Sequence, residues 1–220
     1  MAVAGTETSP VRVEARLDLP LSRWLWLVKW ILVIPHWIVL CFLWVAFVLL
    51  TVVAFFAILF TGRYPRGIFD FNLGVLRWSW RVSYYAYGGL GTDRYPPFSL
   101  GAEPDYPATL DVTYPGELSR GLVLVKWWLL ALPHYLVVGV FVGGWFQERW
   151  GGGGLIGLLA LFAGVALAAT TRYPPGIFDL LVGLNRWVLR VVAYAALMTD
   201  SYPPFRLDQG GVGPADRDVR

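Results

Sequence analysis

Charged residues, cysteine and histidine are all scarce in this chain of 220 residues. Only 15% of the residues are charged, whereas an average soluble domain has about 25%. The single cysteine, Cys41, cannot form an intrachain disulfide, and its place in an apolar run predicts a small buried hydrophobic side chain. The two histidines lie in different halves of the chain, so the usual histidine ligation of a metal is missing. We therefore expect no metal ion and no cofactor.

Basic runs are also missing, and no set of catalytic residues recurs at a usable spacing. The net charge is only +3, and the dispersed Lys and Arg argue against a nucleic-acid partner. The glycines at 151–154 are not followed by the Lys-Ser/Thr of a phosphate-binding loop. We predict that the protein is not an enzyme and does not bind nucleic acid.

Apolar residues are abundant instead. They make up 57% of the chain, and twelve tryptophans are present, a side chain that favours the headgroup zone of a bilayer. The first apolar run begins near Trp24 and exceeds the length of a signal peptide, so we expect it to remain as a membrane anchor. Residues 1–10 are expected to be a disordered tail and residues 209–220 a polar tail.

Four segments of the first half recur in the second half with a period of about a hundred residues. Paired segments are 21–30 with 118–127, 35–36 with 133–134, 63–70 with 172–179, and 93–98 with 200–205. These recurrences predict a tandem duplication, with repeats at 11–101 and 106–208.

Alternating apolar and polar residues predict a small β-element outside the membrane. The alternation covers 11–17 and returns at 108–114. The Tyr-Pro-Pro-Phe segments favour extended backbone, so we also expect strands at 97–101 and 204–208. Pairing between the two copies would hold them together.

Long apolar runs predict membrane helices at about 22–61, 121–146 and 155–171. The run from 24 to 60 exceeds one upright crossing, and Pro35 is the expected point of division. In the second half, the polar and glycine-rich residues 147–154 predict a loop between two helices. We favour two membrane-entering helices per copy with both β-segments on one side. That arrangement requires a tight hairpin within residues 24–60, or a crossing by the helix that follows. An inverted duplication is the alternative.

Amphipathic helices are predicted at about 67–89 and 176–198. In each, an aspartate, a glycine and two arginines share one stripe at i, i+4, i+7 and i+11. We favour a position in the membrane interface, where the arginines meet anionic headgroups. The alternative is that the two stripes face each other, with Asp70 and Asp179 paired across to the arginines.

These repeated motifs resemble the bacterial family called domain of unknown function 4389, over roughly residues 11–207 as two copies. The resemblance rests on the Leu-Val-Lys-Trp…Pro-His, Tyr-Pro-Arg/Pro-Gly-Ile-Phe-Asp and Asp-x-Tyr-Pro-Pro-Phe segments and on the arginine-bearing helices. It implies a multi-pass membrane protein and carries no established activity. The expected fold class is thus a mainly α integral membrane protein, with duplicated membrane helices, amphipathic interfacial helices and a small extramembrane β-element.

Polar residues of the repeated motifs are the candidate contacts to lipids or a partner. They are Lys29, His36, Arg63, Asp70, Arg77, Arg81, Lys126, His134, Arg172, Asp179, Arg186 and Arg190. The lysines and histidines could bind a phosphate or relay a proton. The interpretation that we favour is that the lysines snorkel and the Pro-His pairs mark a kink near the headgroups. The arginines of the Arg-Tyr-Pro turns could hold phosphate groups, but we favour a structural turn with a snorkelling arginine.

The expected function is that of a lipid-interacting, accessory or scaffold protein in a bacterial plasma membrane. Its expected partners are membrane lipids, including anionic headgroups, and a membrane protein or further copies of the chain. A small internally duplicated transporter or channel component is the alternative. The distribution of arginines favours a cytoplasmic position for the amphipathic helices.

Overall fold

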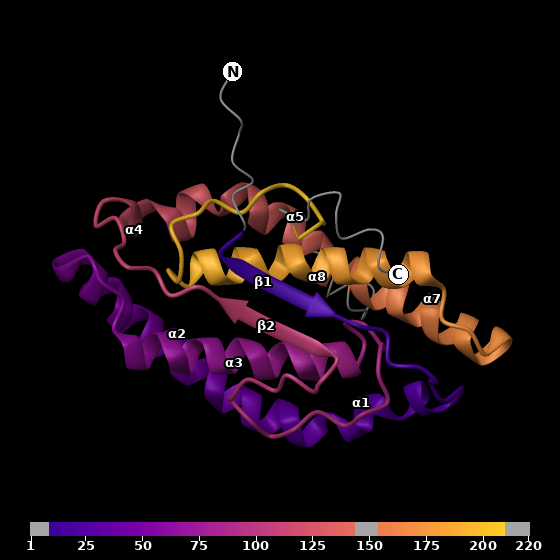
Figure 1. Ribbon diagram of the computed structural model, residues 1–220. Coiled ribbons are helices and arrows are strands. Elements are labelled where there is room, and N and C mark those ends of the chain that lie inside the picture. The colour runs from indigo at the N-terminus through magenta and orange to yellow at the C-terminus, as the bar shows by residue number, and fades with distance from the viewer. Residues whose placement is uncertain (1–8, 144–153, 210–220) are drawn as a thin grey trace.

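The computed structural model describes residues 9–143 and 154–209, and it is mainly helical, as the sequence predicts (Figure 1). Helical elements of the first half are η1 (Leu25–Leu27), α1 (Lys29–Leu32), α2 (Ile34–Thr61) and α3 (Arg66–Tyr85). Those of the second half are α4 (Leu122–Val125), η2 (Lys126–Leu130), α5 (Leu132–Val142), α7 (Gly154–Thr170) and α8 (Pro175–Ala195). The strands are β1 (Val11–Ala15) and β2 (Ala108–Val112).

The apolar run of the first half is divided at Val33, two residues before the expected Pro35. This proline lies in the first turn of α2, where a missing N–H breaks no helical hydrogen bond. The helix then continues to Thr61 and ends at Gly62, whose φ of 71° is a left-handed conformation that glycine adopts easily. A tight hairpin within residues 24–60 is therefore wrong. No glycine or charged residue between Pro35 and Gly62 interrupts the helix.

The apolar run of the second half is bent rather than straight. The segments Leu122–Leu130 and Leu132–Val142 meet at an angle of 43°, next to Pro133. The second segment ends at Gly143 with a φ of 84°. The loop expected at 147–154 lies outside the described residues except for its last glycine, where α7 begins.

Strands from the two halves pair with each other, as expected. β1 and β2 are antiparallel, with Val13 opposite Leu110 and Arg12 opposite Asp111. The strands expected at 97–101 and 204–208 are wrong, because neither segment contains strand structure. Prolines there lack the N–H that a ladder needs, and backbone carbonyls of both segments accept hydrogen bonds from arginines of α3 and α8.

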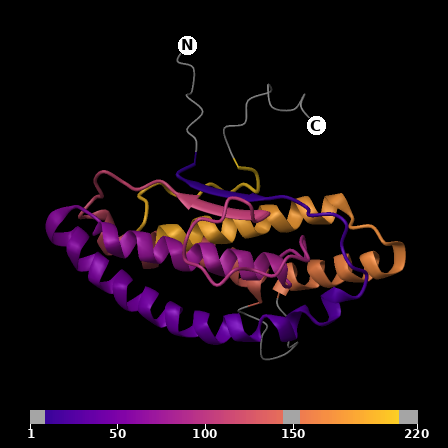
Figure 2. The ribbon, with the colours of Figure 1, turned by 60° about the horizontal axis from the view of Figure 1, so that its bottom comes forward.

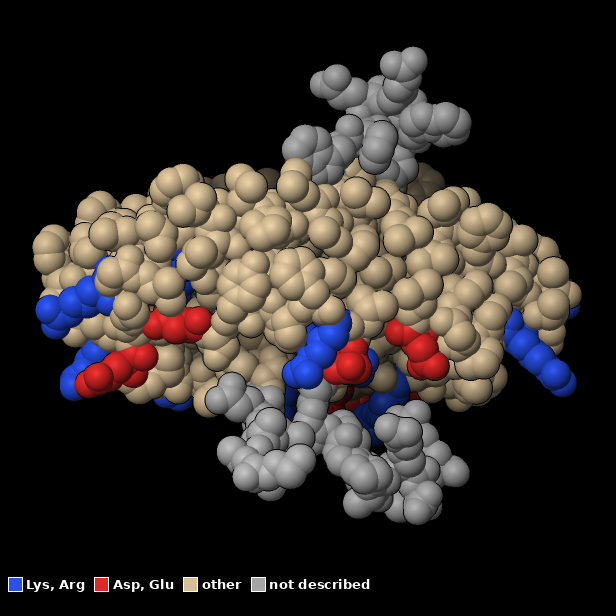
Figure 3. All heavy atoms as spheres, turned by 90° about the horizontal axis from the view of Figure 1, so that it is seen from above, with Lys and Arg blue, Asp and Glu red and all other residues tan. Residues whose placement is uncertain are grey.

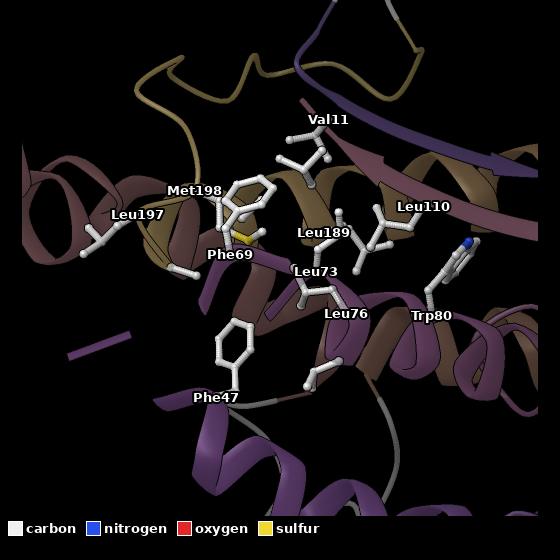
Figure 4. Packing of buried hydrophobic residues seen from close by; sticks show 14 of the residues in the cluster. Val11, Phe47, Phe69, Leu73, Leu76, Trp80, Leu110, Leu189, Leu197 and Met198 are labelled. Carbon is white, nitrogen blue, oxygen red and sulfur yellow. The ribbon is translucent and has the colours of Figure 1, made fainter. Parts of the chain in front are cut away.

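The molecule has layers, with the sheet lying over α3 and α8 (Figures 1 and 2). On the far side of these two helices lie α2 and α7 (Figure 2). Apolar side chains of the strands point toward α3 and α8, and Figure 4 shows Val11 and Leu110 close to Leu73, Leu76 and Leu189. The polar side chains that alternate with them face outward, so the sheet is charged on its outer surface.

Glycines on the arginine stripes allow close packing of the extended segments. A Cβ at Gly74 would lie 2.8 Å from both the side chain and the carbonyl oxygen of Leu100, and one at Gly183 would lie 2.8 Å from the side chain of Leu207. The stripe glycines therefore make room for the chain that follows each Tyr-Pro-Pro-Phe motif.

Candidate functional site

The two lysines in the apolar runs are buried ion-pair partners rather than surface groups. Lys29 Nζ lies 2.9 Å from Asp93 Oδ1 and donates to the carbonyl of Thr92 at 2.7 Å. Lys126 Nζ lies 2.7 Å from Asp200 Oδ1 and donates to the carbonyl of Thr199 at 3.0 Å. Both lysines are at most 1% exposed. Each therefore ties the start of its apolar helices to the aspartate of the Asp-x-Tyr-Pro-Pro-Phe motif.

Both histidines are buried in matching aromatic surroundings. The indole N–H of Trp78 donates to His36 Nδ1 at 3.0 Å, and Trp187 donates to His134 Nδ1 at the same distance. Because Nδ1 accepts a hydrogen bond, a neutral ring carries its proton on Nε2. The first ring stacks on Phe98 at 3.9 Å, and the second has a phenylalanine in the corresponding place. In this structure the histidines bind protein groups and join the Tyr-Pro-Pro-Phe segments to the helices.

Arginines of the two stripes bind the backbone of the same chain. Arg77 donates to the carbonyl of Leu110 at 3.0 Å and to the carboxylate of Asp111 at 2.7 Å, so α3 holds β2. Arg186 donates to the carbonyl of Val13 at 2.9 Å, so α8 holds β1. The stripes therefore lie under the sheet and the extended segments.

The second arginine of each stripe is more deeply buried. Arg81 donates to the carbonyls of Ser99 and Gly101, and Arg190 to those of Arg206 and Asp208. Both are 2% exposed, so neither reaches a lipid headgroup in this structure. Sequence periodicity identified the stripe but did not show what covers it.

The aspartates of the stripes stay at the surface. Asp70 pairs with Arg66 one helical turn away, at 3.3 Å, and Asp179 is exposed. The alternative in which they pair across to the stripe arginines is wrong for Arg77 and Arg81, whose partners are described above. The turn arginines Arg63 and Arg172 are also exposed, so contact between these two and anionic headgroups stays a prediction.

Sequence reasoning missed a reciprocal contact between the two halves. The hydroxyl of Tyr64 donates to the carbonyl of Ala196 at 3.3 Å, just beyond α8. The hydroxyl of Tyr173 donates to the carbonyl of Gly89 at 2.5 Å, just beyond α3. Each tyrosine comes from an Arg-Tyr-Pro turn, so the recurrence of that turn in the two halves of the sequence was the available signal. The lysine–aspartate pairs recur in the sequence in the same way.

The outer side of α2 is apolar and exposed. Only 17% of its most apolar 18-residue stretch is buried, and the mean hydropathy of that stretch is 3.0. Cys41 lies on this exposed side, so its expected burial is wrong. Exposed apolar side chains of α2 include Trp37, Ile38, Phe42, Val45, Leu49, Phe56 and Phe60.

Exposed apolar residues continue onto the second half, over η2, α5 and α7. Figure 3 shows Lys, Arg, Asp and Glu gathered on the side of the sheet, and the opposite part of the visible surface carries none. Among the described residues, α2 alone is long and apolar enough to cross a membrane, or α2 and the bent pair 122–142 if the pair forms one span. The molecule therefore has one charged side and one apolar side.

An apolar groove of about 560 Å³ lies on the apolar side of the molecule, between α2 and the second half of the chain. Its walls include Phe47 and Phe55 from α2, Trp127 from η2, Tyr135 from α5 and Val191 from α8. Ligand sites in proteins have volumes of about 300–1,000 Å³. The lining suits a hydrocarbon chain better than an ion. Within the described residues, no three or more His, Cys, Asp or Glu cluster as a metal site would need.

Residues 23–99 match the model of a protein family described as Domain of unknown function (DUF4389). The match lies within the first half of the chain, so the expected resemblance is confirmed for that half alone. No curated protein matches the chain. No solved structure matches it either.

Proposed function

We propose that this chain is a non-enzymatic integral membrane protein that interacts with lipids or acts as an accessory or scaffold subunit of a membrane complex. The observation that carries the proposal is the exposed apolar surface of α2. Soluble monomers rarely expose contiguous apolar patches larger than a few hundred Å², whereas acyl chains surround such a surface without cost. A bacterial plasma membrane is the proposed location, in keeping with the expectation from the sequence.

We also propose that the two halves arose by tandem duplication. Support comes from contacts that occur once in each half: a buried lysine with an aspartate, a histidine with a tryptophan, and an arginine with the backbone of an extended segment. These contacts stabilise the fold and leave its charged outer side free for a partner.

The native cysteine provides a direct test of membrane insertion. A nitroxide attached to Cys41 in reconstituted phospholipid vesicles is expected to collide more with oxygen than with a water-soluble nickel complex. A matched control is Gly116→Cys in a Cys41→Ser background, because Gly116 is exposed after β2 and a Cβ there meets no atom within 4 Å. The control should show the reverse preference. Equal nickel access at both positions would refute membrane insertion.

A transporter or channel component is the second candidate, and the recurrence of contacts in the two halves favours it. Against it, the stripe arginines bind backbone carbonyls, and the groove beside α2 is apolar. Reconstituted vesicles that show no flux of ions or lipids above empty vesicles would leave the scaffold proposal as the better one.

A further inference from the structure

The long helix α2 is tied at both ends to the same two-stranded sheet. We propose that α2 lies in the plane of the membrane, within one leaflet, and does not cross the bilayer. This inference rests on the proposed function, because it assumes that the apolar side of the molecule contacts lipid. The partner surface is a single layer of phospholipid acyl chains.

The start of α2 is held close to the end of β1. Three residues after β1, Asp18 accepts a hydrogen bond from the Thr92 hydroxyl at 2.8 Å, and its own N–H donates to the carbonyl of Gly91. Asp93 then binds both Lys29 and the N–H of Ser22. A short chain of hydrogen bonds thus joins the sheet to the residues that precede α2.

The end of α2 is held close to the end of β2. The carbonyl of Gly62 accepts a hydrogen bond from the N–H of Leu118 at 2.8 Å. Two residues after β2, the Tyr114 hydroxyl donates to the carbonyl of Tyr64 at 2.5 Å. Because β1 and β2 are antiparallel, their ends lie at opposite ends of one sheet. The helix therefore runs along the sheet, with α3 between them (Figures 1 and 2).

An upright α2 would carry the sheet into the membrane with it. Its 28 residues correspond to a length of about 42 Å, and the sheet and α3 extend in the same general direction. Arg12, Glu14 and Asp111 are exposed on the outer side of that sheet. Charged side chains and open sheet edges are strongly disfavoured in hydrocarbon. In the flat orientation these charges stay in water, and the apolar side of α2 faces the acyl chains.

The charge distribution of the whole molecule agrees with the flat orientation. In Figure 3 the charged side chains lie on the sheet side, at both ends of the long axis of the molecule and between them. A helix that spans a bilayer has polar zones beyond both of its ends, on opposite faces of the membrane. Here the groups bound to the two ends of α2 belong to one polar layer.

Cysteine labelling at positions before and after α2 tests the orientation of the helix. In a Cys41→Ser background, Ser22→Cys reports on the residues before α2, and Gly67→Cys reports on those after it. Gly116→Cys marks the sheet side. Ser22 is exposed, and a Cβ at Gly67 or Gly116 meets no atom within 4 Å. Thr61→Cys, at the exposed last residue of α2, is a second reporter should the Gly67 variant fail to fold.

Sealed vesicles of uniform orientation are treated with a membrane-impermeant maleimide, before and after permeabilisation. We expect Ser22→Cys, Gly67→Cys and Gly116→Cys to be labelled from the same side, whichever side that is. Labelling of the first two from opposite sides would overturn the in-plane orientation and leave the membrane proposal standing. Release of the protein by an alkaline wash without detergent would instead overturn the membrane proposal itself.

Discussion

Removal of the Asp93 carboxylate tests the anchoring of α2 by its buried lysine. Lys29 is 1% exposed, and its charge is balanced by Asp93 at 2.9 Å. Asp93→Asn keeps the size of the side chain but removes the counter-charge of the buried cation, which keeps only neutral acceptors such as the carbonyl of Thr92. The amide offers one oxygen and one NH2 group, so it cannot accept from both the Lys29 ammonium and the N–H of Ser22 as the carboxylate does.

The expected loss is large because the lysine is buried. Removing one partner of a buried ion pair typically costs about 3–5 kcal/mol of unfolding free energy. The Asp93 side chain is 24% exposed, so water reaches the pair, and we expect a loss of about 2–3 kcal/mol. The control is Asp70→Asn. It breaks a pair whose side chains are 55% and 66% exposed, and it should cost less than about 0.5 kcal/mol.

Unfolding of the purified protein in detergent, followed by circular dichroism, measures both losses. The double variant Lys29→Met/Asp93→Asn should recover most of the stability lost in Asp93→Asn, because an apolar side chain needs no counter-charge. If Asp93→Asn cost no more than Asp70→Asn, or if the double variant were less stable than the single one, the buried pair would not anchor α2.

Three further results are expected in the same unfolding assay. Gly74→Val should lower the free energy of unfolding by about 1–3 kcal/mol, because its Cβ would lie 2.8 Å from Leu100. Gly67→Ala should be nearly neutral, because a Cβ there meets no atom within 4 Å. Equal losses in the two variants would contradict the close packing at Gly74. Burial raises the pKa of Tyr64 to about 12, so the unfolded state ionises first and the free energy of unfolding should fall as pH rises from about 10 to 12. If the free energy of unfolding of Tyr64→Phe fell just as steeply over this range, Tyr64 would not be the cause. Arg77→Lys should cost about 1 kcal/mol, because an ammonium cannot reproduce the two-pronged contact with β2; no change in stability would show that this contact does not hold the strand.

Local patterns in the sequence predicted most elements of the fold. Alternation of apolar and polar residues identified both paired strands, and the apolar runs with Pro35 and Gly62 explain where α2 begins and ends. The same local reasoning failed for the Tyr-Pro-Pro-Phe segments, because extended backbone before proline does not by itself provide a pairing partner. It also failed for Cys41, because an apolar run does not specify which of its sides is covered.

The chemistry of the candidate site depended on contacts between distant segments. Periodicity placed Arg81 and Arg190 on the polar stripes of amphipathic helices but could not distinguish a lipid phosphate from a backbone carbonyl as their acceptor. The carbonyls that they bind follow each arginine by 16 to 20 residues. Their approach depends on the small size of the glycine one turn before Arg77 or Arg186.

The sequence by itself determined the helical class, the apolar character, the recurrent motifs and the residues available for polar contacts, because these follow from composition and periodicity. Tertiary structure alone decided which of those residues face outward. Lys29 and His36 are buried because the chain after α3 folds back over them. Whether one side of a helix meets protein or remains bare depends on segments that are distant along the chain, and the path of those segments brings both ends of α2 to one sheet.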